Sequence, residues 1–507
     1  MPSRSTWLTI LALLLLLASF TPAGAARAAT LTPFQHVIII VQENHSFDNY
    51  FGTYPTANGT LVTPITSMLP AVNGIPDGVC APYEGGCLSP SLATTPTPTD
   101  PEEGQLNYEE DYSNNATGFA ESSGPQSMVY FDYHTIPAYW DYAEEYGIGD
   151  NYFSPVLTQT NANRLMMLTG DTPVSGDQPP PPYTQYNGTL MSQLDRAGVS
   201  WGYFDWLNSN GTFTDVRVLS YIQGMPPSAV EDVQDISNLT SDLATGSGLP
   251  NVAFVSSLGD RTFDEHPSED ITTGEQWVVS IVNDVMESSY WNSTAVFITW
   301  DEGGGFYDHV IPPNEFTVDN NFTSPLHGFG QRIPLLVISP YSWESYVSGT
   351  LMSHLSLDHF IEYNWNLPAL NSLVASANLP LDFFDFARTP RAPLVLGGSG
   401  TYSMAKYPLP LQPLVPSVTQ TVTATMTSTV TLPPKTVTTT SDATIYESET
   451  TTVTTTATVT SGQSSSSVSV AYLAVVTVDA LAFIASALLL RETARRSRGG
   501  LLRNPEG

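Results

Sequence analysis

The chain of 507 residues carries 16 Lys and Arg against 49 Asp and Glu, which gives a net charge of −33 at pH 7. A surface with this excess of negative charge repels nucleic acid and anionic membranes, so nucleic acid is not an expected partner. Lysine occurs only as Lys406 and Lys435, and the balance favours either an acidic medium, in which many carboxylates are neutral, or a salt-rich one.

Residues 1–29 have the pattern of a secretory signal peptide. Arg4 precedes an apolar run at 8–17, and small residues at 23–28 offer a cleavage site. We therefore expect an exported protein from which the signal peptide has been removed. The region 30–415 is long enough for one large domain, with or without insertions.

The stretch 36–54, HVIIIVQENHSFDNYFGTY, is expected to organise this domain. Its aliphatic run at 37–41 predicts a strand buried on both faces, as in the middle of a parallel sheet. The strand ends in Glu43 and Asn44, where open α/β sheets place ligands, and both side chains offer oxygen atoms that suit a hard cation. A polar turn at the end of the strand is the alternative.

A long irregular segment follows at 53–126, rich in Pro, Gly, Asn and Thr, and we predict an insertion that covers the site. It contains the only two cysteines, Cys80 and Cys87, for which an exported chain favours a disulfide across a short loop over two free thiols. Several Asn-x-Thr sequons agree with a glycosylated, exported surface.

The next two segments place polar groups at helix starts. Apolar spacing at 136–146 predicts a helix, with His134 just before it. The sequence TNANR begins a short helix that Gly170 can end, and a hydroxyl such as that of Thr160 at a helix N-terminus favours a phosphate or an alkoxide. An ordinary N-cap role for Thr160 is the alternative.

The remaining pattern alternates strands with helices, which predicts an α/β fold. One helix is expected to begin with a capping box formed by Thr272 and Glu275. A strand end again delivers adjacent carboxylates, Asp301 and Glu302, followed by three glycines that allow a close approach of the backbone. These helices and strands are expected at 190–197, 199–204, 252–258, 272–286, 294–299, 332–339 and 354–363.

The C-terminal part has a different composition. Thr, Ser and Val dominate residues 416–467, which predicts a stalk, with an extended β-rich segment as the alternative. The apolar run 468–490 predicts a transmembrane helix, and the basic tail 491–507 would remain in the cytoplasm. The predicted location is therefore the extracellular face of the membrane with a single C-terminal anchor, and the stalk would contact the cell envelope. Asp479 is an unusual residue within such a span.

Four motifs, ENHSFDNYFG, TNANR, DEHP and ITWDEGGGFYDHV, occur in this order within 34–367. Together they resemble the phosphoesterase family of bacterial phospholipases C and related acid phosphatases, within the alkaline-phosphatase superfamily. The resemblance implies an α/β fold of the alkaline-phosphatase type, in which a mixed, mostly parallel sheet lies between helices and carries long loop insertions.

The same resemblance implies a site for a divalent or transition metal ion, with Ca, Mg, Mn, Fe and Zn as the candidates. Thr160 would be the nucleophile and a further metal ligand, although Ala162 replaces the usual proline of this turn and Thr158 lies nearby. Asp308 would orient His309, while His45, His359 and Ser46 are expected to be structural or supporting. The implied metal ligands are Glu43, Asn44, Asp301 and Glu302; the histidines of the phosphate pocket are His134, His266, His309 and His354; the substrate-binding residues are Asn163 and Arg164.

The predicted function is that of a metal-dependent phosphoesterase that forms a phosphothreonine intermediate. Its substrate would be a phospholipid head group or a small phosphomonoester. A sulfatase or a nucleotide pyrophosphatase of the same superfamily is one alternative, and Thr160 argues against a sulfatase, which uses Cys or Ser. A catalytically inactive, stalked surface protein is the other alternative.

Overall fold

The computed structural model describes residues 29–57, 60–61, 72–172, 184–206, 217–313 and 329–397, together with four strands between 420 and 461. The chain divides into two compact units, Met1–Tyr407 and Pro408–Gly507. Each unit is described by itself below.

The first unit is built on an eight-stranded sheet in the order β13-β11-β14-β1-β15-β16-β8-β17. All neighbouring strands run parallel except at β16, which is antiparallel to both β15 and β8. The predicted α/β class with a mixed, mostly parallel sheet is therefore confirmed. The strands are β1 (His36–Gln42), β8 (Gly147–Gly149), β11 (Trp201–Asp205), β13 (Val233–Asp235), β14 (Val252–Ser256), β15 (Thr294–Trp300), β16 (Leu335–Ile338) and β17 (Tyr346–Ser348).

Strand β1 lies between β14 and β15, and all seven of its residues are buried. This burial explains its run of aliphatic residues, since a central parallel strand is covered on both faces. In the register between β1 and β15, Gln42 lies opposite Trp300. The residues that follow, Glu43 and Asp301, therefore leave the sheet side by side at its carboxyl edge.

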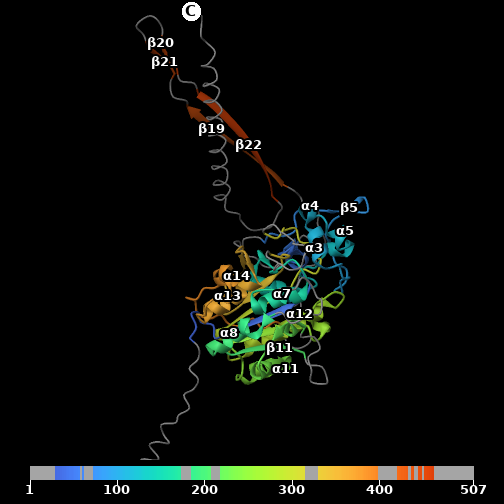
Figure 1. Cartoon of the computed structure of the whole chain (residues 1–507). Coiled ribbons are helices and arrows are strands. Elements are labelled where there is room, and N and C mark those ends of the chain that lie inside the picture. Colours follow the sequence, from blue (N-terminus) through green and yellow to red (C-terminus); the bar gives the residue numbers. More distant parts are fainter. Residues whose placement is uncertain are drawn as a thin grey trace, which may run out of the picture. The chain divides into compact units, whose positions relative to one another are not determined.

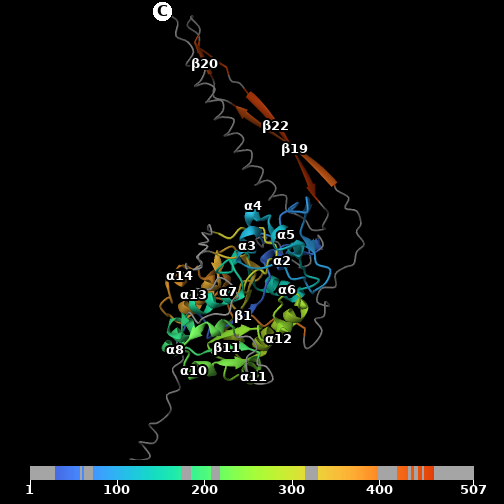
Figure 2. The same cartoon turned by 45° about the vertical axis from the view of Figure 1, so that its right-hand side comes forward.

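Helices cover both faces of the sheet, with α7, α8 and α13 on one side and α6, α11 and α12 on the other (Figures 1 and 2). One apolar cluster joins the odd-numbered residues of β1, including Ile39, to α7, α8 and α13. These helices are α6 (Pro137–Glu145), α7 (Thr160–Thr169), α8 (Leu190–Ala197), α11 (Ile236–Thr245), α12 (Ile271–Glu287) and α13 (His354–Asn364).

The predicted capping box of α12 is wrong. Asp270 is the N-cap, and its side chain accepts a hydrogen bond from the backbone N–H of Thr272. Glu275 instead accepts hydrogen bonds from the backbone N–H groups of Ala138 and Tyr139, at 2.8 and 3.0 Å. Its carboxylate thus satisfies orphan donors at the start of α6 and connects the two helices.

The predicted insertion is more regular than its composition suggested. Its described part contains the short helices α3 (Gln105–Asp111), α4 (Ser113–Ala116) and α5 (Phe119–Ser122). A small apolar cluster joins this part to Tyr307 in the loop after β15. The strands β4 (Ala81–Tyr83) and β5 (Gly86–Leu88) form a hairpin.

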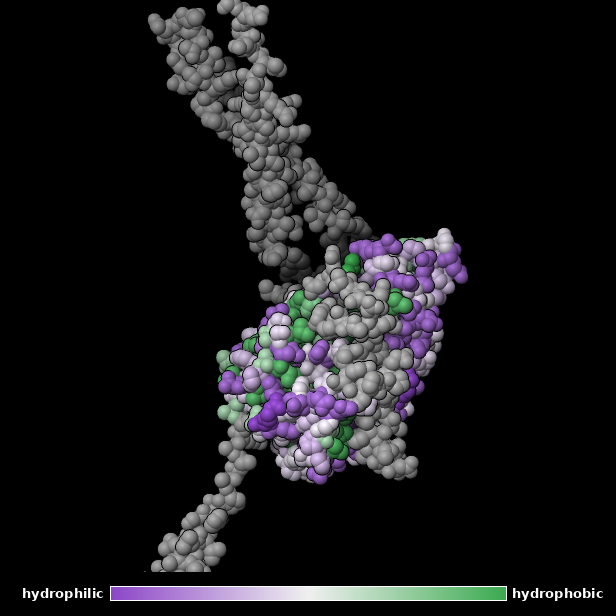
Figure 3. All heavy atoms as spheres, in the orientation of Figure 1, coloured by the Kyte–Doolittle hydropathy of each residue, from purple (hydrophilic) through white to green (hydrophobic). Residues whose placement is uncertain are grey.

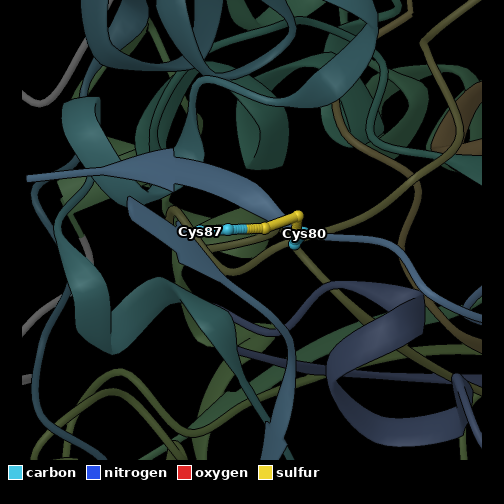
Figure 4. The surroundings of a disulfide bond; sticks show 2 residues. All are labelled: Cys80 and Cys87. Carbon is cyan, nitrogen blue, oxygen red and sulfur yellow. A yellow bond between two sulfur atoms is a disulfide. The ribbon is translucent and has the colours of Figure 1, made fainter. Parts of the chain in front are cut away.

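The expected disulfide between Cys80 and Cys87 closes this hairpin, as Figure 4 shows. In the space-filling view, hydrophilic side chains dominate around the outer part of the insertion, with scattered hydrophobic residues elsewhere on this face (Figure 3).

The Thr- and Ser-rich segment of the second unit forms β-strands. Strands β19 (Gln420–Thr431) and β22 (Thr450–Ser461) pair antiparallel, as do β20 (Lys435–Thr438) and β21 (Thr444–Glu447). The extended β-rich alternative therefore describes these strands.

The predicted location must be corrected. No helix within the described ranges is long and apolar enough to cross a bilayer, so a C-terminal transmembrane anchor on the outer face of a membrane is not supported. The apolar run 468–490, the basic tail 491–507 and nearly all of the predicted signal peptide 1–29 lie outside the described residues.

Candidate active site

Polar side chains from two strand ends meet at the carboxyl edge of the sheet. We call Glu43, Asn44, Asp301 and Glu302 the carboxylate clamp. All four are buried, and the backbone N–H of Asn44 points to Asp301 Oδ1 at 3.4 Å. The backbone at position 304 lies close to the backbone of Asn44, and this contact requires glycine. Gly304 has a φ of +61°, and a Cβ there would lie 2.4 Å from the carbonyl oxygen of Asn44.

Arg164 lies under the clamp and is 4% exposed. Its Nε donates to Asp301 Oδ2 at 2.9 Å, and its Nη2 lies 3.3 Å from Glu43 Oε1. Further donors of the guanidinium reach Ser256 Oγ and the carbonyl oxygen atoms of β1. The predicted substrate-binding side chain is thus engaged with the sheet and the clamp, which gives it a positioning role here.

The clamp holds more negative charge than Arg164 can balance. Burial raises the pKa of Glu43 well above its usual value, and the nearby Asp301 adds to this effect. Burial also raises the pKa of Glu302, with Glu103 and Asp301 as further causes. A buried group of acids with raised pKa values favours the binding of a cation.

Two atoms of the clamp are ready to bind such a cation. Among the residues that the structure describes, Asn44 Oδ1 and Glu302 Oε1 are buried and have no hydrogen-bond partner. Buried polar atoms without a partner are rare, because each costs on the order of 1–3 kcal/mol. Oxygen donors of amide and carboxylate type suit Mg, Ca or Mn, so the residues fit a metal ion.

Thr160 is the first residue of α7 and is 8% exposed. The N-cap position belongs to Gln159, so the alternative that Thr160 is the cap is wrong. Asn163, which was expected to bind substrate, holds the preceding loop: its Oδ1 accepts from Val156 N at 3.0 Å and its Nδ2 donates to Thr158 O at 2.7 Å. These bonds fix the turn that presents Thr160.

Two of the predicted histidines lie beside the clamp. His266 Nε2 is 3.5 Å from Glu103 Oε1, and burial lowers its pKa from the usual value. His354 is fully buried, with Nε2 3.0 Å from the carbonyl oxygen of Trp300, and burial lowers its pKa to about 4. His354 is therefore neutral at pH 7 and supports the end of β15.

The structure does not bring the other two histidines to the clamp. His134 is half-exposed and pairs with Asp132 at 3.0 Å. His309 Nδ1 lies 2.6 Å from Asp48 Oδ2, and its Nε2 faces Asn73 Oδ1 at 3.1 Å.

Asp48, Asp308, His309 and Arg332 form what we call the Arg332 cluster. The guanidinium of Arg332 lies 3.0 Å from Asp308 Oδ1 and 2.8 Å from Asp48 Oδ1. Asp308 therefore binds the arginine, and Asp48 is the residue that orients His309, which corrects the expected pairing.

Sequence reasoning missed two residues of the insertion that contact the clamp. Glu103 Oε2 accepts from Asn44 Nδ2 at 3.1 Å, and the hydroxyl of Tyr108 donates to Glu302 Oε2 at 2.7 Å. Apart from the acidic pair at 102–103, no sequence pattern marks these residues, because the path of an insertion cannot be read from its composition.

It also missed Glu265, a fully buried carboxylate next to His266. Glu265 accepts hydrogen bonds from Gln42 and Trp300, the residues that directly precede the two halves of the clamp. The hydroxyl groups of Tyr50 and Tyr139 donate to it as well.

Among the described residues, two groups of three side chains could each hold a metal ion. Within each group, the potential ligand atoms lie within 4.8 Å of one another. The first consists of Asp48, Asp308 and His309, where Arg332 already supplies the positive charge. The second, Asp100, Glu103 and His266, lies beside the clamp, because Glu103 contacts Asn44.

A family model described as the Phosphoesterase family matches residues 34–368. Phospholipase C B of Mycobacterium tuberculosis (strain ATCC 25618 / H37Rv) is 27% identical over 389 residues, which cover 65% of this chain and 72% of that protein. Non-specific phospholipase C6 of Arabidopsis thaliana is 25% identical over 344 residues, or 61% of this chain and 62% of that one.

Among solved structures, an alkaline phosphatase superfamily protein from Vibrio parahaemolyticus is 10% identical and covers 58% of this chain and 70% of its own, with a TM-score of 0.31. The family match is the stronger finding. It extends from β1 through α13 and contains every candidate residue of the site.

Proposed function

Because the chain belongs to the Phosphoesterase family and is a hydrolase of phosphoric ester bonds, we propose that it cleaves phosphate esters through a phosphothreonine intermediate on Thr160. The substrate is a phospholipid head group, as in a phospholipase C, or a small phosphomonoester, as in an acid phosphatase. The observation that carries the proposal is the pair of unpartnered, buried oxygen atoms of Asn44 and Glu302 in the clamp.

The clamp holds the metal ion in this proposal, with Glu43, Asn44, Asp301 and Glu302 as ligands and Thr160 as a further one. When bound, the ion would lower the pKa of the threonine hydroxyl, offset charge on the phosphoryl oxygens and counter the repulsion between an anionic substrate and a chain of net charge −33.

The residues of the chain carry the two steps. The Thr160 hydroxyl loses its proton to solvent and Oγ1 attacks phosphorus in line; the bond from phosphorus to the ester oxygen breaks, and protonated His266 gives the leaving alcohol its proton. Water then attacks phosphorus and returns a proton to His266, the bond to Thr160 breaks, and the threonine oxygen regains a proton from solvent. Arg164 keeps Glu43 and Asp301 in place throughout.

Replacement of the nucleophile tests this mechanism. Thr160→Ala is expected to reduce kcat by about 10³-fold or more while the protein stays folded, because no covalent intermediate can form. Thr158→Ala is the matched control, since it removes the same side chain two residues earlier and should retain most turnover. Near-normal activity of Thr160→Ala with loss in Thr158→Ala would move the nucleophile to Thr158.

The substrate class is decided by comparing p-nitrophenyl phosphate with p-nitrophenyl phosphocholine. Preference for the phosphocholine diester supports the phospholipase C activity, and preference for the monoester supports an acid phosphatase. Loss of both activities on removal of metal, with recovery on its return, supports the clamp. No bound metal and no turnover of either ester would favour a binding protein.

A further inference from the structure

We propose that two residues of the insertion, Glu103 and Tyr108, are positioning residues that set which oxygen atoms of the carboxylate clamp face the metal ion. This inference rests on the proposed function only in that a metal ion occupies the clamp. It gives the insertion a role in metal affinity in addition to any contact with substrate.

The first step concerns the side-chain amide of Asn44. Its oxygen can bind a cation, whereas its NH₂ group is a donor and cannot. Glu103 Oε2 accepts from Nδ2 at 3.1 Å, so the amide is held with Oδ1 on its other side, where it is buried and has no partner among the described residues. Without this acceptor, the amide could adopt either of its two orientations. One of these would turn its NH₂ group, instead of Oδ1, toward the ion.

The second step concerns Glu302. Its Oε2 accepts from the hydroxyl of Tyr108 at 2.7 Å and from the backbone N–H of Gly304, also at 2.7 Å. Its Oε1 is the atom that has no partner in the described part of the chain. The same arrangement recurs at both residues: a donor or acceptor outside the clamp engages one atom and leaves one oxygen for the ion.

The third step is the connection between the two positioning residues. The Tyr108 hydroxyl lies 3.3 Å from Glu103 Oε2, and Glu103 Oε1 lies 3.5 Å from His266 Nε2. Glu103, 15% exposed in its side chain, thus links one clamp residue to the proposed proton donor. Partners of metal ligands orient those ligands, and their loss typically reduces metal affinity or activity about 10–100-fold.

The competing explanation is that these bonds only fasten the insertion to the domain. Tyr108→Phe separates the two, because it keeps the fully buried ring and removes only the hydroxyl. Tyr112→Phe is the matched control: Tyr112 lies one turn further along the insertion, its ring packs on Phe119, and its buried hydroxyl has no partner among the described residues.

The experiment is calorimetric titration of metal-free, full-length protein with Mn²⁺, Ca²⁺ and Zn²⁺, followed by titration of each variant with the ion that binds the wild type best. Tyr108→Phe and Glu103→Ala are expected to bind that ion about 10–100-fold more weakly. Tyr112→Phe is expected to match the wild type. Glu103→Gln keeps an acceptor oxygen and is expected to restore most of the affinity lost in Glu103→Ala.

A second readout excludes a merely structural effect. Tyr108→Phe loses a hydrogen bond that Tyr112→Phe does not, so its metal-free form should melt only slightly below that of Tyr112→Phe. Saturating metal should restore turnover of Tyr108→Phe to near the wild-type kcat. Equal metal affinities of these two variants, or a wild type that binds none of the three ions, would overturn the inference. Weaker binding by Tyr108→Phe in a protein that hydrolyses neither ester would uphold it while the proposed function fails.

Discussion

Two buried arginines, Arg164 and Arg332, each lie between two carboxylates, yet the charges around them are balanced differently. In the Arg332 cluster, all four oxygen atoms of Asp48 and Asp308 accept hydrogen bonds. His309 adds a further donor to Asp48. This cluster is satisfied by the protein alone, and it fastens α2 (Phe47–Phe51) to the loop after β15.

Around Arg164, the charges of the carboxylates are not balanced by the protein. The clamp contains three carboxylates against one guanidinium, Glu103 adds a fourth at its edge, and two oxygen atoms have no partner within the described residues. The comparison shows that buried acid–arginine contacts alone do not mark a functional site. The site is marked by the carboxylate charge that the arginine does not balance and by the oxygen atoms that accept no hydrogen bond.

The largest expected effect is on the free energy of unfolding when either arginine is replaced. Arg332→Met leaves Asp48 and Asp308 buried without their cation, and we expect the free energy of unfolding to fall by about 3–5 kcal/mol whether or not metal is present. Arg164→Met should also destabilise the metal-free protein, but bound metal can replace the lost charge there. Urea unfolding with and without Mn²⁺ measures the difference. Equal recovery of both variants on addition of metal would break the comparison.

The next effect concerns metal affinity. Asp301→Asn removes a charged ligand, so its affinity for metal should fall by more than the roughly 100-fold upper range for loss of a ligand's partner. Asp308→Asn should leave metal affinity unchanged and instead lower the free energy of unfolding by about 1–3 kcal/mol, because a bond to the guanidinium is weakened. Calorimetric titration and urea unfolding of both variants distinguish the two clusters. Weaker metal binding by Asp308→Asn would place the ion in the Arg332 cluster.

The sequence predicted the clamp because its signal is local: two buried strands end in polar pairs, and strands that run parallel bring their ends together. It could not predict Glu103 and Tyr108, since the position of an insertion depends on packing that its composition does not reveal. The pairing of Asp48 with His309 also escaped, because neighbours in sequence suggested Asp308. The antiparallel direction of β16 could not be predicted either, because a short apolar run looks the same in a parallel and in an antiparallel strand.

A third buried acid pair, Asp358 and Glu362 in α13, extends the comparison to a site that has no arginine in contact within the described part of the chain. Burial raises the pKa of Asp358 well above its usual value and that of Glu362 from 4.5 to about 7. The folded protein therefore keeps protons that the unfolded chain has lost, so the free energy of unfolding falls as pH rises from about 4.5 through 7.

Glu362→Gln tests this dependence, because it keeps the shape of the side chain and cannot ionise. We expect the wild type to lose on the order of 1–2 kcal/mol between pH 5 and pH 8 from Glu362, and the variant to lose less. Urea unfolding at the two pH values measures the change. An unchanged pH slope in the variant would show that Glu362 does not hold its proton in the folded state.

The smallest expected effect concerns His309, because both ring nitrogens are engaged by protein groups, Asp48 Oδ2 and Asn73 Oδ1. His309→Gln should lower kcat less than about tenfold and reduce the free energy of unfolding by about 1 kcal/mol, the typical worth of a hydrogen bond. His266→Gln, which removes the proposed proton donor beside the clamp, should lower kcat about 10²–10⁴-fold. Initial rates with p-nitrophenyl phosphocholine and p-nitrophenyl phosphate measure both. A loss in His309→Gln as large as that in His266→Gln would mean that the Arg332 cluster takes part in the reaction, and the separation between a satisfied and an unsatisfied cluster would no longer hold.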